Sequence, residues 1–220
     1  MLRYPISTIL YLAKLNIKDK IQDILKIHNN IDVRLTIKVK DKDGKIIKYH
    51  KQRSHSFVAN FMALLGTLLS KTAYNWTDIS GNVEQFFTGN VNINIILNAN
   101  CGSLGNCGIV IGTGTATPTP QDYKLGNQIA NGTGSGQMVY NSPSFSAPTV
   151  SGNTITFKIT QSFENESGAS ITVTEVGIQA ETDNTSAPDY VLIVHDLLSS
   201  PITVANLSIL QITYTISVTT

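Results

Sequence analysis

The chain has 220 residues, of which only 14% are charged, whereas about 25% are charged in an ordinary soluble domain. A chain of this length can build one good-sized core. No segment reaches the ~18 consecutive apolar residues of a transmembrane helix. The first apolar segment is interrupted by Lys14 and lacks the features of a secretory signal. These observations exclude a helical membrane protein, and we expect a soluble chain.

The net charge of +1 conceals an uneven distribution. Residues 1–71 contain 14 of the 16 Lys and Arg residues and five Asp, a net charge of +9, whereas residues 72–220 have two Lys and ten acidic residues, a net charge of −8. Such a division favours different environments for the two parts, with the basic part facing nucleic acid, an anionic membrane surface or an acidic partner. The alternative is that both parts are solvated faces of one monomer.

Residues 1–30 form a candidate basic arm. Apolar residues recur there at spacings of three or four between Lys side chains, which predicts one long or two short amphipathic helices over residues 5–27. Such a helix lies on a membrane, docks on a partner or packs on its own domain. The apolar positions are Ile6, Ile9, Leu10, Ala13, Ile17, Ile21, Ile24 and Leu25.

Residues 31–220 form the candidate main domain, in which strict alternation of apolar and polar residues predicts strands. The fold class that we expect is mainly β: an antiparallel, jelly-roll-like β-sandwich with the N-terminal helix and one further helix, residues 54–70, packed on the sheet. A turn at residues 41–44 makes the first two strands a hairpin. The main predicted strands are residues 31–39, 46–49, 154–163, 170–179, 190–196 and 207–218.

The middle of the chain is less regular. Ser54 or Ser56 can cap the helix over residues 54–70. Residues 73–90 show no clear periodicity of apolar residues, so we expect a loop there. The patterns of residues 91–98 and 108–112 predict strands. Residues 113–152 predict a long ordered loop with one short strand around residues 137–140, and loops of this length usually form functional surfaces or contact partners.

We expect no catalytic, cofactor-binding or metal-binding residues. Cys101 and Cys107 have no nearby His, so they cannot complete a local zinc site; they form a disulfide in an oxidising setting or remain free. The best candidate for a catalytic group is Glu175 with His195 and Asp196, but these residues lie in or at the ends of predicted strands.

Glu175 is instead a candidate structural latch. In the strand around it, Val173 and Val176 are three residues apart, so strict alternation fails once. A β-bulge near residues 175–177 would restore the register and turn Glu175 inward. A buried carboxylate needs hydrogen-bond donors, and the backbone amides of residues 112–125 are the nearest candidates.

Three stretches together resemble a family of virion structural proteins of double-stranded DNA viruses and phages. They are Arg-Ser-His-Ser-Phe-Val-Ala-Asn-Phe at residues 53–61, Gly-Ile-Val-Ile-Gly-Thr-Gly at residues 108–114 followed by residues 120–125, and residues 163–168 with Ile-Thr-Val-Thr-Glu-Val-Gly at 171–177. The basic start and sparsely charged remainder resemble proteins of turreted icosahedral archaeal viruses from hot acidic springs.

The resemblance implies a non-enzymatic protein located in the virion, where it assembles with copies of itself and other virion proteins into a capsid vertex, a turret or a tail part. It implies no cofactor and no small-molecule substrate. The alternative is a receptor- or glycan-binding β-sandwich, as in a spike or adhesin. Exposed aromatic clusters would favour that alternative, and the candidates are Tyr74, Trp76, Phe86 and Phe87.

Overall fold

The computed structural model describes residues 30–54, 57–70, 74–85, 98–100, 102–103, 105–184 and 187–219. Within these residues the protein is mainly β, with antiparallel sheets, as predicted. The predicted helix over residues 5–27 and nearly all of the predicted strand over residues 91–98 lie outside the described residues. Among the described residues, no helix is long and apolar enough to cross a membrane.

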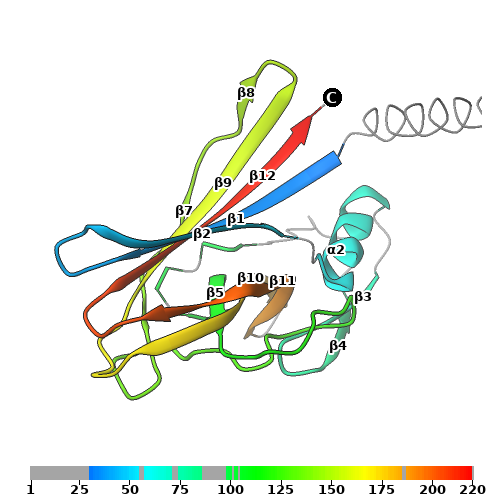
Figure 1. Cartoon of the computed structure of the whole chain (residues 1–220). Coiled ribbons are helices and arrows are strands. Elements are labelled where there is room, and N and C mark those ends of the chain that lie inside the picture. Colours follow the sequence, from blue (N-terminus) through cyan, green and yellow to red (C-terminus); the bar gives the residue numbers. More distant parts are fainter. Residues whose placement is uncertain are drawn as a thin grey trace, which may run out of the picture.

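The larger sheet has seven strands. Its main path runs in the order β2-β1-β12-β9-β6, and the short strands β7 and β8 also pair with β9 (Figure 1). The long strands are antiparallel, and their registers are unbroken between β1 and β12 and between β12 and β9. The strands are β1 (Asn30–Lys40), β2 (Ile46–Ser54), β6 (Val139–Tyr140), β7 (Ser144–Phe145), β8 (Thr149–Ser151), β9 (Thr154–Glu164) and β12 (Ile209–Thr219).

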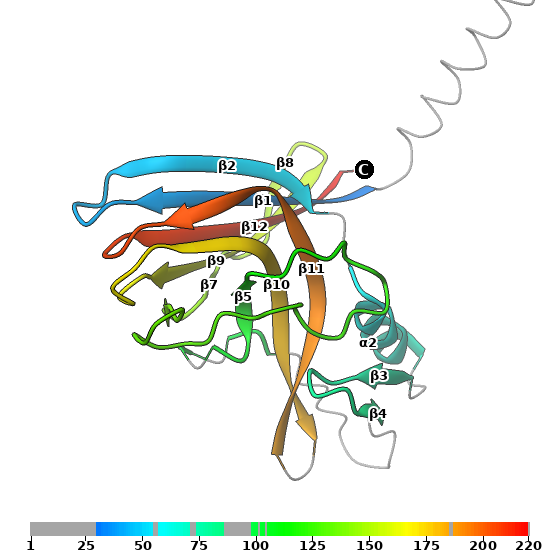
Figure 2. The ribbon, with the colours of Figure 1, turned by 60° about the horizontal axis from the view of Figure 1, so that its bottom comes forward.

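The second sheet has three strands in the order β11-β10-β5, with β10 in the centre. Figure 2 shows β10 and β11 curving away from the larger sheet toward the helix α2 and a small hairpin. The elements are β5 (Gly108–Gly112), β10 (Ile171–Asn184), β11 (Ala187–Val204), α2 (Ala59–Ser70) and the hairpin strands β3 (Asn75–Thr77) and β4 (Val83–Gln85).

The hairpin of β1 and β2 forms as the alternating pattern predicts. Val33, Leu35, Ile37 and Val39 are buried, and the polar residues between them are exposed or half-buried. The turn closes where Asp41 accepts hydrogen bonds from two backbone amides, and Gly44 has a φ of 81°, which glycine adopts without strain. Ile31 departs from the pattern, because it is 56% exposed.

Both sheets contribute to one hydrophobic core, which surrounds β5. All five residues of β5 are buried. Tyr140 packs edge-on against Phe163, with ring centroids 4.7 Å apart, and its hydroxyl donates a hydrogen bond to the carbonyl of Ile129. Burial of a large side chain stabilises a fold by about 1.5–3 kcal/mol. The fully buried core residues include Leu35, Ile109, Ile111, Val173, Val176, Leu210, Ile212 and Tyr214.

The helix begins later than the sequence predicts. The structure extends β2 to Ser54, and Phe57 then makes an isolated bridge to Val194 of β11. The amide of Val58 donates to the carbonyl of Ile193, so the chain is still extended there. The helix therefore starts at Ala59 because residues 57 and 58 pair with the second sheet.

The predicted loop over residues 73–90 is wrong in part, because β3 and β4 form a hairpin within it. Asp78 holds the turn: its carboxylate accepts hydrogen bonds from the amides of Ser80 and Asn82 at 2.9 and 2.7 Å. The loop over residues 113–152 also contains more regular structure than predicted, since β6, β7 and β8 all pair with β9.

Candidate functional site

Glu175 lies inside the molecule, where β10 passes between β5 and β11. It is opposite Gly112 and Leu197 and is only 1% exposed. The register between β10 and β11 shifts between Val173 and Glu175. An irregularity therefore exists, but it precedes the predicted position at residues 175–177. Next to this irregularity, Thr174 and Glu175 both bind the same residue, Gly114, at 2.7 and 2.8 Å.

Four donors surround the two carboxylate oxygens of Glu175. Oε1 accepts hydrogen bonds from the backbone amides of Gly114 and Asn127, each at 2.8 Å. Oε2 accepts one from the amide of Gly126 at 2.9 Å and faces Nε2 of His195 at 3.0 Å. A buried carboxylate is costly unless such donors compensate its lost hydration. Here three of the four donors belong to one loop, residues 113–127.

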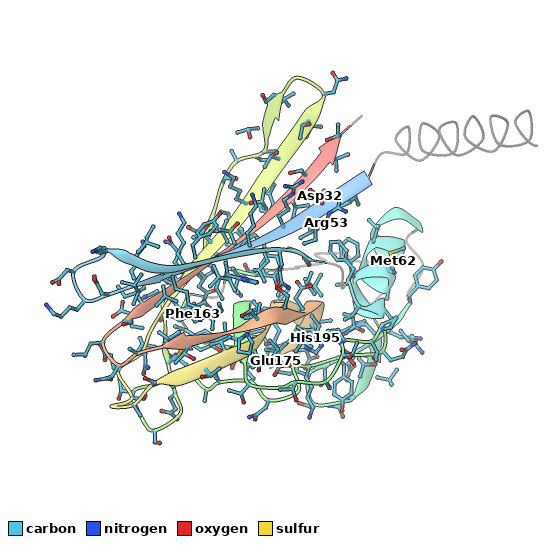
Figure 3. The ribbon with its side chains drawn as sticks, viewed as in Figure 1. Asp32, Arg53, Met62, Phe163, Glu175 and His195 are labelled. Atoms are coloured by element: carbon cyan, nitrogen blue, oxygen red, sulfur yellow. The ribbon has the colours of Figure 1, made fainter. Side chains whose placement is uncertain are left out.

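His195 joins Glu175 to a second carboxylate. Its Nε2 faces Glu175, and its Nδ1 lies 2.6 Å from Oδ2 of Asp122 (Figure 3 shows His195 beside Glu175). Ionised carboxylates only accept hydrogen bonds, so both ring nitrogens must donate and the ring carries a positive charge. We call Glu175, His195 and Asp122 the carboxylate–histidine cluster.

The pKa values of the cluster agree with this protonation. Burial alone would raise the pKa of Glu175, but the hydrogen bonds from His195 and the three amides outweigh it and lower the pKa to about 2. Burial likewise opposes the charged form of His195, yet the two carboxylates raise its pKa above the ordinary value. For Asp122, hydrogen bonds from Thr119 and His195 overcome the effect of burial and lower the pKa. All three groups are therefore ionised near pH 6.

The loop reaches the cluster because local turns shape it. Asp122 closes a turn with Thr119, whose amide and hydroxyl both donate to the Asp122 carboxylate; Pro120 fits the second position of such a turn. The carbonyl of Pro120 also accepts the amide of Ala59, the first residue of α2, at 2.7 Å. The loop thus connects β5, β10, β11 and the start of the helix.

The arrangement is suited to holding the loop, and poorly suited to proton transfer. A general base needs a free lone pair within reach of a substrate, and both nitrogens of His195 already face carboxylates. Asp196 is not part of the cluster: its Oδ2 accepts the hydroxyl of Tyr214 at 2.9 Å in the core. Of the three residues weighed as the best catalytic candidates, Glu175 and His195 therefore lie together, whereas Asp196 lies apart from them. Among the described residues, no group of three His, Cys, Asp or Glu is arranged to hold a metal ion.

The other residues singled out from the sequence lie apart from the cluster. Cys107 is buried and disulfide-bonded, and Cys101 lies outside the described residues. Trp76 is 3% exposed, so it is not available to bind a glycan at the surface, whereas Tyr74 is 45% exposed. Phe86 and Phe87 lie outside the described residues. Of the four aromatic residues singled out for the glycan-binding alternative, Tyr74 is therefore the one that the structure shows at the surface.

Sequence reasoning missed Asp122, and it grouped His195 with Glu175 only as a catalytic candidate and not as a partner of the latch. Gly126 and Asn127 also lie just beyond the loop segment expected to supply donors. One signal for this packing exists in the sequence: the glycines at 112, 114 and 126 allow the backbone to approach a side chain closely. A Cβ atom at Gly112 or Gly114 would collide with the Glu175 carboxylate.

Comparison with known proteins finds no matching family model, no matching curated protein and no matching solved structure. The resemblance to virion proteins therefore stays a hypothesis.

We expect Gly114→Ala to lower the free energy of unfolding by about 1–3 kcal/mol, the usual cost of overpacking. The added Cβ would lie 2.5 Å from Oε1 of Glu175, whereas a Cβ at Gly126 would lie at an ordinary 3.4 Å from Oε2. Gly126→Ala is thus the matched control, and its stability should change by less than about 1 kcal/mol. Urea denaturation of both variants makes the comparison. Equal destabilisation would contradict the close approach of the loop to the cluster.

Proposed function

We propose that this chain is a non-enzymatic structural protein of a double-stranded DNA virus particle, which assembles with copies of itself in a capsid vertex, turret or tail part. In this proposal the two larger sheets are the layers of a jelly-roll-like sandwich. The observation that supports assembly most directly is the outer edge of β2.

β2 is an edge strand with exposed apolar side chains. Among the described strands it pairs only with β1, so its other edge has no strand partner, although the side chains of Lys48 and Gln52 bind the backbone of β11. Ile46, Ile47 and Tyr49 are 48%, 55% and 58% exposed. An exposed edge of this kind favours pairing with another chain, and neighbouring subunits in a symmetric assembly cover such edges.

Charge supports the same kind of contact. The β2 segment carries Lys48, Lys51 and Arg53, and residues 72–220 have a net charge of −8, to which seven acidic residues besides the three buried ones contribute. The basic edge of one copy and the acidic surface of the next are complementary, which favours association and fixes its orientation. The basic residues also discourage pairing of two β2 edges with each other.

The carboxylate–histidine cluster supports a structural role. It ties the loop over residues 113–127 to β10 and β11 through hydrogen bonds on every cluster member. A shell or spike protein benefits from ordered loops at its contacts, because ordering a flexible loop during assembly would cost conformational entropy. In this role the basic residues 1–30 face inward, toward nucleic acid, a membrane surface or other virion proteins.

The proposal is tested on virus particles. Particles are purified from a culture that expresses the chain, analysed by mass spectrometry and imaged after immunogold labelling of the chain. We expect a stoichiometric component whose label gathers at vertices or tails. Purified particles that lack the chain would overturn the proposal, and a purified chain that binds glycans as a monomer would favour the spike or adhesin alternative.

The isolated chain should self-associate at high micromolar concentration through the β2 edge. Ile47→Lys places a further charge on that edge and should shift the mass measured by light scattering toward the monomer. Val150→Lys is the control, because Val150 is 73% exposed on the short strand β8 and should leave the mass unchanged. A wild-type chain that remains monomeric, or equal effects of both variants, would count against assembly through β2.

A further inference from the structure

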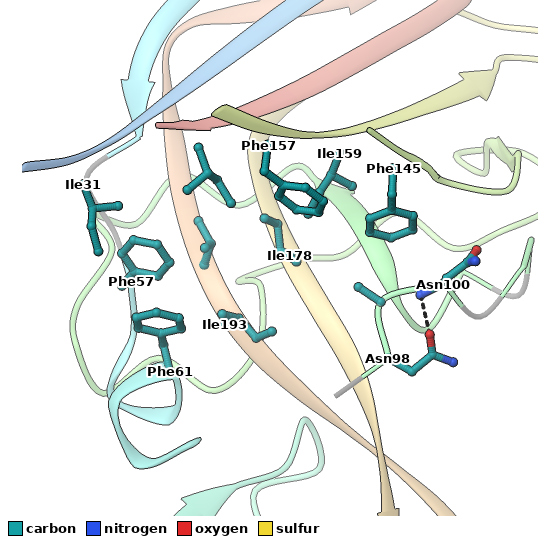
Figure 4. Close-up of a pocket in the computed structure, with 13 residues that line it drawn as sticks. Ile31, Phe57, Phe61, Asn98, Asn100, Phe145, Phe157, Ile159, Ile178 and Ile193 are labelled. Carbon is teal, nitrogen blue, oxygen red and sulfur yellow. Dashed lines mark hydrogen bonds between the residues drawn. The ribbon is translucent and has the colours of Figure 1, made fainter. Parts of the chain in front are cut away.

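An apolar cavity of about 480 Å³ opens between the larger sheet, β10, β11 and the helix α2 (Figure 4). Phe57 and Phe61 stack on one side of it with ring centroids 4.1 Å apart, and Phe145 stacks with Phe157 on another side at 6.2 Å. Ile31 also lines it. The cavity has the size of a ligand pocket, but its surface is almost entirely hydrocarbon.

The polar groups at the cavity are few. Asn98 and Asn100 are the only polar residues among those that line it. Oδ1 of Asn98 already accepts the backbone amide of Asn100 at 2.8 Å (dashed line in Figure 4). A small ligand usually needs several placed polar groups to fix its orientation. The lining instead suits a set of aliphatic side chains presented by a polypeptide.

The arm joins the domain at this cavity. Residue 30 starts β1, and the next residue, Ile31, lies at the cavity with 56% of its surface exposed. The residues that precede β1 carry the apolar stripe of the predicted amphipathic helix, and Ile21, Ile24 and Leu25 are its last members. We propose that these three side chains occupy the cavity of their own chain and anchor the base of the arm there.

The short connection between the predicted helix and β1 favours the chain's own arm, and not the arm of a second copy, as the occupant of the cavity. Residues 28–30 span about 10 Å when extended, so the end of the stripe cannot move far from Ile31. A tether this short gives an effective concentration in the millimolar range, which a second copy matches only at millimolar protein concentration.

The cavity is much smaller than the whole arm. A helix over residues 5–27 would be about 35 Å long, so only its last turns find room. The apolar positions nearer the N-terminus, Ile6 to Ile17, remain available for another surface. This inference concerns the base of the arm and does not depend on the proposed role in a virus particle.

The direct test is NMR on the full-length chain with labelled methyl groups and aromatic rings. We expect nuclear Overhauser contacts from the methyl groups of Ile24 and Leu25 to the rings of Phe57 and Phe61. A mixture of labelled and unlabelled chains separates contacts within one molecule from contacts between molecules, and only contacts within one molecule support the proposal.

A fluorescent hydrophobic dye provides the second measurement. In the full-length double variant Ile24→Asn, Leu25→Asn, dye fluorescence should rise several-fold because the cavity is vacated. The double variant Gln22→Asn, Asp23→Asn changes neighbouring polar positions and should bind no more dye than the wild type. Circular dichroism checks that all three chains contain the same strand content.

Four results would overturn the proposal. Contacts found only between molecules would assign the cavity to a second copy, and contacts from another part of the chain would assign it to that part. Stoichiometric binding of laurate by the wild-type chain at the Phe57 and Phe61 rings would assign the cavity to a small apolar ligand. Equal dye fluorescence in all three chains would show that the arm does not cover the cavity.

Discussion

Replacing Glu175 by Gln should lower the free energy of unfolding by about 3–5 kcal/mol, the cost of breaking a buried ion pair by removing one partner. Glu175 is 1% exposed, and both of its oxygens accept hydrogen bonds. A Gln side chain has one oxygen and one NH₂ group. The NH₂ group would face either two backbone amides or one amide and His195, all of them donors.

The loss of stability in Glu175→Gln should be greatest in the loop over residues 113–127. Gly114, Gly126 and Asn127 all donate to Glu175, so a weakened acceptor releases residues 113–127 before it disturbs the sheets. Limited proteolysis should therefore cut the variant within this loop at protease concentrations that leave the wild-type chain intact. Urea denaturation measures the accompanying change in stability.

Glu166→Gln is the matched control, because Glu166 is exposed in the turn after β9 and its replacement should change the stability by less than about 0.5 kcal/mol. A double-mutant cycle with His195→Gln then isolates the coupling between the two cluster members. A Glu175→Gln chain with unchanged stability and unchanged loop cleavage would show that the cluster does not hold the loop.

The long strands were predictable because one physical rule decides them. Along most of their length β1, β9 and β12 have one face in the core, so alternation in the sequence reports burial there, whereas Ile31 and Ile155 at the strand ends are 56% and 45% exposed. β10 follows the rule less well: residues 175–180 are all buried, since the strand lies between the larger sheet on one face and the loop on the other. The failed alternation at Val173 and Val176 was therefore a useful signal of a special position at Glu175.

The partners of Glu175 were harder to predict because they depend on the tertiary fold. Asp122 and His195 are 73 residues apart in the chain, and Asp122 reaches the cluster only through a turn built by Thr119 and Pro120. No periodic pattern marks such a contact. The late start of α2 has a similar cause. The sequence around Val58 is compatible with a helix, but the amide of Val58 donates a hydrogen bond to Ile193 of β11.

The charged cluster should make the protein most stable in mildly acidic solution. The pKa of His195 is raised from its ordinary value of 6.5, so above pH 6.5 the unfolded chain loses this proton while the folded chain keeps it. The pKa of Glu175 is lowered from 4.5 to about 2, so below pH 4.5 the unfolded chain gains a proton that the folded chain does not. The contribution of both groups is therefore complete between pH 4.5 and 6.5 and decreases on either side.

Stability should then fall as the pH rises above 6.5, by at most about 1.4 kcal/mol per pH unit until the raised pKa of His195 is passed. Urea denaturation from pH 4 to pH 9 measures this slope. His195→Gln should remove the slope, whereas His50→Gln should keep it, because the ring of His50 contacts the neutral side chains of Gln52 and Ser199. A wild-type chain whose stability increases from pH 6.5 to 8 would show that His195 is not held as a cation between Glu175 and Asp122. A slope that survives in His195→Gln would assign it to another group.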